Sequence, residues 1–383
     1  MDERLTYTKK EAGLYLTGLF GQNLIYNIVT AGLYYYFQNV ICLPAMALGW
    51  IFAIARIWDA INDPMMGSIV DKTKSKWGKC KPYLLFAPLV VCVITCVAFL
   101  NGNYAVAKQE GNTSAMVLIV AWAAVSYILW GMSYTAGDVP LWGVISRMSE
   151  VEKDRANLIA LARIVASIAA GLGIVSVVAL SQAANKQFGE SENAQKGFIV
   201  VGIAMTVVAS LLFECAGLGV KERVPNSEET KTMKESFILM WKCKPFRRLM
   251  ISGILRAPLQ LLATVVMTLF TYYYCDGDLT NAFSNAKTFL TIVIVGGAFF
   301  IGQFGATAVC PALMKKTDVK KLYNLTALSA VPLALLFVTY LIAPAELTKI
   351  GWVVIDGILL LFAGVGFGAV AVCQSVMISD CID

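Results

Sequence analysis

The chain has 383 residues, of which 58% are hydrophobic and only 15% are charged, and its mean hydropathy is +0.69. A soluble globular protein usually carries about a quarter charged residues, so this composition excludes an ordinary soluble fold. The net charge is +6 and the chain has no histidine, which excludes histidine proton relays, zinc–histidine sites and histidine-dependent catalytic triads.

Ten apolar runs are long enough to cross a bilayer as helices, which takes about 18 or more apolar residues. The polar N-terminal segment has no signal-peptide pattern, so we expect the first run to stay in the protein. We therefore predict an all-α polytopic membrane protein. The predicted spans are residues 14–37, 44–70, 83–100, 115–145, 158–183, 197–220, 249–275, 286–313, 322–342 and 351–378.

Lysine and arginine are distributed unequally between the two sides of the predicted bundle. If the spans alternate, 23 of these residues fall on the side of the N-terminus and five on the opposite side. Basic loops stay in the cytoplasm, so we expect a cytoplasmic N-terminus and insertion in the cytoplasmic membrane. Because the basic residues lie in short segments beside a membrane, they do not indicate a nucleic-acid partner.

The longest polar connection divides the chain into two halves. We predict an N-terminal six-helix bundle at 1–220, a cytoplasmic linker at 221–248 and a C-terminal bundle at 249–383. Gln22 and the tyrosine triplet 34–36 recur at a constant offset as Gln260 and the triplet 272–274. Two six-helix halves are typical of a major facilitator transporter, so we expect ten of twelve spans here, with the C-terminal two absent.

Polar side chains cluster inside the second span, where an ionisable residue is costly and usually functional. Asp59, Asn62 and Asp63 are spaced to share one helix face. Pro64 cannot donate to the carbonyl of Ala60, which frees another oxygen nearby. This oxygen-rich set suits Na⁺ or Li⁺, or the two carboxylates could share a proton. The alternative is a structural pair between Arg56 and Asp59, although one arginine cannot neutralise two acids.

A second polar cluster lies in the fourth span. Thr135, Asp138 and Trp142 face one way, and Pro140 releases the carbonyl of Ala136. A carboxylate can accept two hydroxyl hydrogen bonds, and an indole offers a flat face to a sugar ring. Trp142 could instead be an interfacial belt residue.

Depth brings these clusters together. At about 1.5 Å per residue, Asp59, Asp63 and Asp138 all lie ~12–18 Å above the cytoplasmic end of their helices, near the middle of the bilayer. Arg163 and Asn23 reach similar depths in the fifth and first spans. Transporters bind substrate and coupling ions at this level. Outside it, we expect Asp356 to be solvated near the outer end of the tenth span, and we assign no role to Glu214 or Arg256.

Two segments, ARIWDAINDPMMG at 55–67 and YILWGMSYTAGDVPLW at 127–142, resemble the glycoside–pentoside–hexuronide:cation symporter family of the major facilitator superfamily. The resemblance extends from GLFGQNLIYN at 18–27 to SDCID at 379–383. It implies a cation site at Asp59, Asn62, Asp63 and Thr135, and a sugar site at Asn23, Tyr134, Asp138, Trp142 and Arg163. Asn23 departs from the melibiose permeases of the family, which carry an aspartate there.

These observations predict a secondary active transporter that couples Na⁺, Li⁺ or H⁺ to the uptake of a glycoside, pentoside or hexuronide. The expected partners are the sugar, the cation and the lipid bilayer, with no other cofactor, and a monomer is expected. Two alternatives stay open: a carrier of an organic anion or lipid, which Arg163 would favour, and a truncated, non-transporting sensor or paralogue. No nucleophile–base pair or phosphate loop suggests an enzyme.

Overall fold

A computed structural model describes residues 6–191, 194–224, 235, 238, 241–275, 286–314, 316–342 and 350–379. These residues contain helices and no strand, which confirms the predicted all-α class. The chain divides into two compact units, Met1–Met233 and Lys234–Asp383. The division falls inside the segment that the sequence predicts as a linker. We describe each unit by itself.

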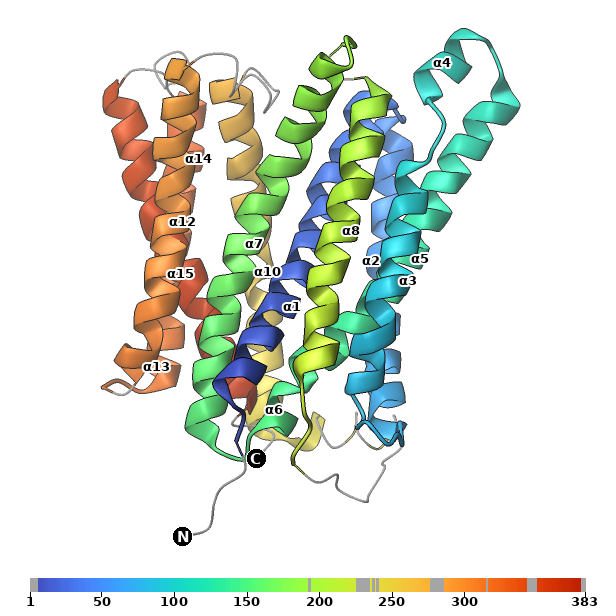
Figure 1. Ribbon diagram of the computed structural model, residues 1–383. Helices are drawn as coiled ribbons and strands as arrows, with labels where there is room; N and C mark the ends of the chain where they lie inside the picture. The colour runs from blue at the N-terminus through green and yellow to red at the C-terminus, as the bar shows by residue number, and fades with distance from the viewer. Residues whose placement is uncertain are drawn as a thin grey trace. The chain divides into compact units, whose positions relative to one another are not determined.

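Unit 1 is a bundle of long helices that stand side by side, with the short α4 at one end and the short α6 at the other (Figure 1). The first helix changes from α- to π-helical geometry at Ile28–Leu33 and again at Tyr36–Val40. The start of α1 lies at the same end as α6, as the alternation of the spans predicts. The α-helices are α1 Lys9–Asn27, α2 Ala45–Lys72, α3 Lys81–Phe99, α4 Tyr104–Gln109, α5 Thr113–Gly143, α6 Ile145–Met148, α7 Glu152–Gln187 and α8 Gln195–Gly219.

Small residues allow α1 and α8 to approach closely. A Cβ added at Gly18 would lie 2.3 Å from the Cβ of Ala216, and one added at Gly21 would lie 2.4 Å from the carbonyl oxygen of Ala209. Lipid tails are as apolar as leucine, so removing apolar side chains from lipid gives little driving force for helix association. Close packing of this kind supplies dispersion energy instead. The α1–α8 contact thereby fixes the position of α1, which carries Gln22 and Asn23.

Unit 2 contains fewer described helices. They are α10 Lys244–Cys275, α12 Ala286–Met314, α13 Val319–Leu325, α14 Ala330–Ile342 and α15 Ile350–Ser379, with a 3₁₀ turn, η3, at Thr326–Ser329. The tyrosine triplet lies at the end of α10, whereas the side chain of Gln260 lies outside the described residues.

Eight helices in the described part of the chain are long and apolar enough to cross a membrane. The two other predicted spans correspond to α1 and α10. Both are helical. Gln22, Asn23 and Asn27 lower the average hydropathy of α1, and the side chains of part of α10 lie outside the described residues. The number of ten spans therefore remains a prediction.

The start of α3 is capped by a carboxylate from the segment that follows α8. Glu222 accepts backbone N–H bonds from Lys79, Cys80 and Lys81 at 2.8–3.0 Å. These donors are among those that a helix N-terminus leaves without an intrahelical partner, and the helix dipole favours an anion there. Gly78 precedes them with φ of +114°, and a Cβ on this residue would lie 2.4 Å from the Glu222 carboxyl carbon.

Substitution of Gly78 by alanine is expected to lower the thermal stability of the purified protein through both its positive φ and its clash with Glu222. Gly111→Ala is the matched control, because Gly111 also has positive φ (+66°) but no atom within 4 Å of an added Cβ. The larger drop in melting temperature should belong to Gly78→Ala, at a cost of ~1–3 kcal/mol. Equal drops would show that the Glu222 contact adds nothing.

The structure overturns one expectation about unit 2. Asp356, expected to be solvated, is fully buried. Its Oδ2 accepts a hydrogen bond of 2.7 Å from the hydroxyl of Tyr274 on α10, and the buried Tyr340 of α14 belongs to the same apolar cluster as Tyr274. The expectation used only the position of Asp356 along its helix. That position does not say whether a neighbouring helix covers the side chain.

The bond between Tyr274 and Asp356 should contribute to the docking of α10 on α15. Tyr274→Phe removes the donor and keeps the ring, and we expect it to destabilise the protein by about 1 kcal/mol, as interhelical hydrogen bonds in membranes usually do. Tyr272→Phe is the control, since Tyr272 is 64% exposed. A melting temperature that falls equally in both variants would contradict the assignment.

Candidate functional site

A cavity of about 150 Å³ lies between α1, α2 and α5 in unit 1. It brings together two clusters that the sequence places on different helices, and its wall also includes the aromatic side chains Tyr26, Tyr127 and Trp130. Five of the nine predicted site residues line it: Asp59, Asp63, Tyr134, Thr135 and Asp138.

The acidic side of the cavity is formed by α2. The hydroxyl of Thr135 on α5 donates to Oδ1 of Asp63 at 3.0 Å, so the predicted cation residues of the two helices are in direct contact. Asp59 lies one turn away, and a Cβ on Gly131 would be 3.2 Å from its Oδ1. A glycine at this position lets α5 come close to the carboxylate.

The structural alternative for Asp59 is present in part. A guanidinium nitrogen of Arg56 lies 3.6 Å from Oδ2 of Asp59, but the Arg56 side chain is 64% exposed. An exposed pair contributes little free energy, and the bond to Asp63 comes from Thr135. The arginine therefore does not account for both carboxylates.

Asn62 does not line the cavity. Its amide nitrogen is buried and has no hydrogen-bond partner among the described residues. A buried amide without a partner is costly in an apolar environment. Its place in the cation site stays a prediction, since its side chain is not part of the cavity wall.

The donor set at this end of the cavity suits a small cation of low charge. Within the described residues, no group of three or more His, Cys, Asp or Glu side chains is close enough to hold a metal ion. An ion here would combine the carboxylates of Asp59 and Asp63 with neutral oxygens, such as that of Thr135. Hard oxygen ligands with only two negative charges match Na⁺, Li⁺ or a proton better than a divalent ion bound by a carboxylate cage.

Asp138 forms the other side of the cavity, and one of its oxygens is held by two donors. Its Oδ1 accepts from the amide of Gln22 on α1 at 2.6 Å and from the indole N–H of Trp142 at 3.1 Å. The same Gln22 amide nitrogen also contacts the hydroxyl of Tyr134. Both donors use Oδ1, and Oδ2 of Asp138 receives no hydrogen bond from the described residues, which leaves this oxygen to accept hydroxyl groups of a ligand.

The remaining predicted residues surround Asp138 without lining the cavity. Asn23 donates to the side-chain oxygen of Gln22 at 2.7 Å, so it orients the amide that bonds Asp138. The guanidinium of Arg163 on α7 lies 4.3 Å from the ring centroid of Trp142. One face of this indole is thus covered by a cation, and only the other face could stack on a sugar ring.

Gln22, Tyr26 and Trp130 belong to the site but are not among the residues predicted for it from the sequence, where Gln22 has only a part in an internal repeat. Gln22 is 1% exposed and joins two site residues; its position inside an apolar run, next to Asn23, was a usable signal. Tyr127, Trp130 and Tyr134 are spaced by three and four residues and therefore share one face of α5. Trp130 stacks on Tyr134 with centroids 5.1 Å apart.

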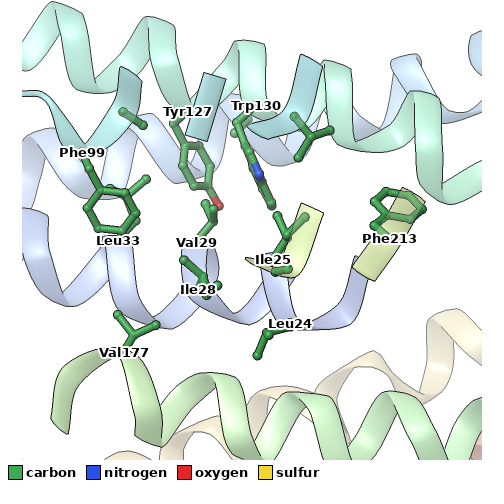
Figure 2. Close-up of a cluster of buried hydrophobic side chains, with 14 of the residues drawn as sticks. Leu24, Ile25, Ile28, Val29, Leu33, Phe99, Tyr127, Trp130, Val177 and Phe213 are labelled. Atoms are coloured by element: carbon green, nitrogen blue, oxygen red, sulfur yellow. The ribbon is translucent and has the colours of Figure 1, made fainter. Parts of the chain in front are cut away.

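These aromatic side chains belong to the core as well as to the cavity. Figure 2 shows Tyr127 and Trp130 reaching from α5 towards Ile25 of α1 and Val29 of the π-helical segment Ile28–Leu33. Tyr26, one residue along from Ile25, lies 5.4 Å from the ring of Tyr134. The aromatic wall is thus fixed by packing on its far side, so its geometry does not depend on a ligand.

A family model described as MFS/sugar transport protein matches residues 14–383. The chain belongs to this family. Membership of this family implies an integral membrane protein that crosses the bilayer several times. The structure is similar to that of the proton:xylose symporter XylE bound to 6-bromo-6-deoxy-D-glucose, with a TM-score of 0.54 and 12% identity over 96% of this chain and 80% of that one, which supports the fold alone.

Two curated relatives are similar in sequence. The isoprimeverose transporter of Lactiplantibacillus pentosus is 27% identical over 214 residues, which is 56% of this chain and 42% of the relative. The inner membrane symporter YicJ of Escherichia coli is 27% identical over 387 residues, covering 100% of this chain and 76% of the relative. The chain thus spans less than half the length of the first relative and about three quarters of the second.

Loss of the Gln22 amide should weaken sugar binding through Asp138. Gln22→Leu removes the donor to Asp138 and to Tyr134, and a hydrogen bond to a charged group is worth ~1.5–3 kcal/mol. We expect a loss of affinity of about tenfold or more for a ligand that bonds Asp138, measured with labelled glycosides by equilibrium binding to the purified protein. The control is Thr17→Val, because the Thr17 hydroxyl bonds only the Gly13 carbonyl of its own helix. Unchanged affinity in Gln22→Leu would show that the Gln22 bond to Asp138 does not support binding.

Proposed function

We propose that this chain carries a glycoside, pentoside or hexuronide across the cytoplasmic membrane by symport with Na⁺, Li⁺ or H⁺. The observation that carries the proposal is the shared cavity of α2 and α5. Asp59 and Asp63 line it together with Asp138, and Thr135 joins the two helices through its bond to Asp63. A cation and a sugar bound there would share the same wall.

This arrangement supplies a physical reason for coupling. A cation between Asp59 and Asp63 would neutralise carboxylates that lie beside Asp138, and it would hold Thr135, only three residues from Asp138, in place. Binding of the sugar to Asp138 would then cost less, because fewer like charges and fewer free conformations oppose it. By linkage, the sugar must raise the affinity for the cation by the same factor.

We assign a role to each of the nine residues. Asp59, Asp63 and Thr135 would bind the cation, with Asn62 beside them. Asp138 would accept sugar hydroxyl groups, and Tyr134 would contact the ring. Asn23, Trp142 and Arg163 would position Asp138 or its partners. The proposal also includes a cytoplasmic N-terminus and a cytoplasmic linker at 221–248.

Two further classes of function compete with symport of a sugar. Arg163 lies behind Trp142 rather than in the cavity wall, so it does not favour an organic anion in this cavity. A non-transporting sensor would bind the same ligands without moving them. Uptake measurements separate these possibilities, because only a carrier accumulates solute against its gradient.

The test is uptake of labelled glycosides, pentosides and hexuronides into vesicles under imposed Na⁺, Li⁺ or H⁺ gradients. We expect accumulation with at least one cation in the unmodified chain and its loss in Asp59→Cys, because the cation then lacks a carboxylate. Asp71→Asn is the control: Asp71 is on the same helix but is largely exposed and pairs with Arg147 at 3.7 Å. It should keep gradient-driven uptake.

Uptake that persists unchanged in Asp59→Cys would exclude the proposed cation site. Accumulation of an organic anion but of no sugar would favour the alternative carrier. Binding of sugar by correctly inserted protein, with no uptake under any gradient, would favour the sensor.

A further inference from the structure

Asp356 is the only ionisable acid of α15, and the bundle of unit 2 encloses it completely. An ionisable side chain inside a membrane bundle is costly and usually has a function. Its Oδ2 accepts the hydroxyl of Tyr274 on α10 at 2.7 Å. Its Oδ1 is buried and has no hydrogen-bond partner in the described part of the chain. One of the two carboxyl oxygens is therefore unsatisfied.

A second buried polar group without a partner lies beside this oxygen. Tyr340 of α14 is 1% exposed, and its hydroxyl makes no hydrogen bond with a described residue. This hydroxyl is near enough to the Asp356 carboxyl group to interact with it electrostatically. A buried polar group without a hydrogen bond is costly. Two such groups next to each other indicate a bond that one additional proton would complete.

An ionised Asp356 would have no positive charge to compensate it among the described residues, whose ion pairs all involve other acids. The titratable groups that face it are Tyr274 from α10 and Tyr340 from α14. The described side chains of α12, which also packs against α15, carry no charge. Removing one charge from water without a partner costs several kcal/mol, so a neutral carboxyl group is the more stable form here.

The surroundings of Asp356 suit a proton better than a metal ion. Unit 2 has cavities of about 800 Å³ and about 200 Å³, and Asp356 lines neither of them. A metal ion needs several oxygen ligands around it, whereas a proton needs one oxygen and no additional space. A carboxylate has about four sites that can accept hydrogen bonds, but a neutral carboxyl group has one donor and fewer acceptor sites. The neutral form matches one hydroxyl donor and one hydroxyl acceptor.

We propose that Asp356 is a proton-binding site of unit 2, in which Oδ1 carries the proton and donates a hydrogen bond to the hydroxyl oxygen of Tyr340. The neutral side chain then joins three helices, because it also accepts from Tyr274. A carboxyl group exposed to water loses its proton at neutral pH, so the proton stays bound only while α10, α14 and α15 are packed together. The site goes beyond the proposed symport and does not depend on the solute that is carried.

The test is infrared spectroscopy of the full chain, purified in a maltoside detergent that has no carbonyl group. A protonated carboxyl group gives a C=O stretching band that a carboxylate lacks. We expect this band in the difference spectrum between the unmodified chain and Asp356→Asn at neutral pH. Asp318→Asn is the matched control. Asp318 is exposed and caps α13 through the backbone N–H of Lys320, and an exposed aspartate is ionised at this pH, so its difference spectrum should lack the band.

A second variant tests the same proton without replacing Asp356. Tyr340→Phe removes the acceptor of the proposed bond and keeps the ring, so the band should persist but move to higher wavenumber. Tyr272→Phe is the control, because Tyr272 is 64% exposed, and it should leave the band in place. Asparagine has the shape of a neutral carboxyl group and supplies the same donor and acceptor. The melting temperature of Asp356→Asn should therefore be unchanged or higher.

The proposal is overturned if neither the Asp356→Asn nor the Tyr340→Phe difference spectrum contains the band. Asp356 would then be ionised, with a counter-ion such as Lys287 or Lys349, whose side chains lie outside the described residues. A band that keeps its position in Tyr340→Phe would also overturn it, because the proton would then have another acceptor. A band that is lost in Asp356→Asn and moves only in Tyr340→Phe would establish the site.

Discussion

The bond between the Gln22 amide and the Asp138 carboxylate connects the helices on which the proposed site depends. Gln22 comes from α1, which is fixed against α8 by small residues, whereas Asp138 comes from α5. A carboxylate inside an apolar bundle needs donors from its surroundings, because neither lipid nor the helical backbone can supply them. Gln22 and Trp142 supply them to one oxygen, and the geometry leaves the other for a ligand.

The same requirement explains how the neighbouring helices are arranged around Asp138. Thr135 lies almost one turn before Asp138 on α5 and bonds Asp63 on α2. Arg163 on α7 stacks on Trp142, which in turn bonds Asp138. Movement of α2, α5 or α7 would therefore change the surroundings of this carboxylate. In a carrier, that sensitivity is the physical basis on which cation binding could alter the affinity for sugar.

Unit 2 meets the requirement in two different ways. Asp356 is buried and receives a hydrogen bond from Tyr274 on another helix, as expected for a polar group that serves packing. Arg256 is fixed by neutral acceptors and borders a cavity that also contains the Gln374 amide. One polar group is enclosed by the bundle, and the other borders a cavity.

The sequence by itself determined the all-α class, the membrane location and the residues around Asp59 and Asp138, because hydropathy, helical periodicity and buried charge are local properties that the bilayer strongly constrains. It also indicated that these clusters lie at one depth. Only the tertiary structure decided that Gln22 holds Asp138, that Arg163 covers Trp142 and that Asp356 is buried. Each depends on which face of one helix meets another, and side-chain packing between distant segments sets that choice rather than any pattern along the chain.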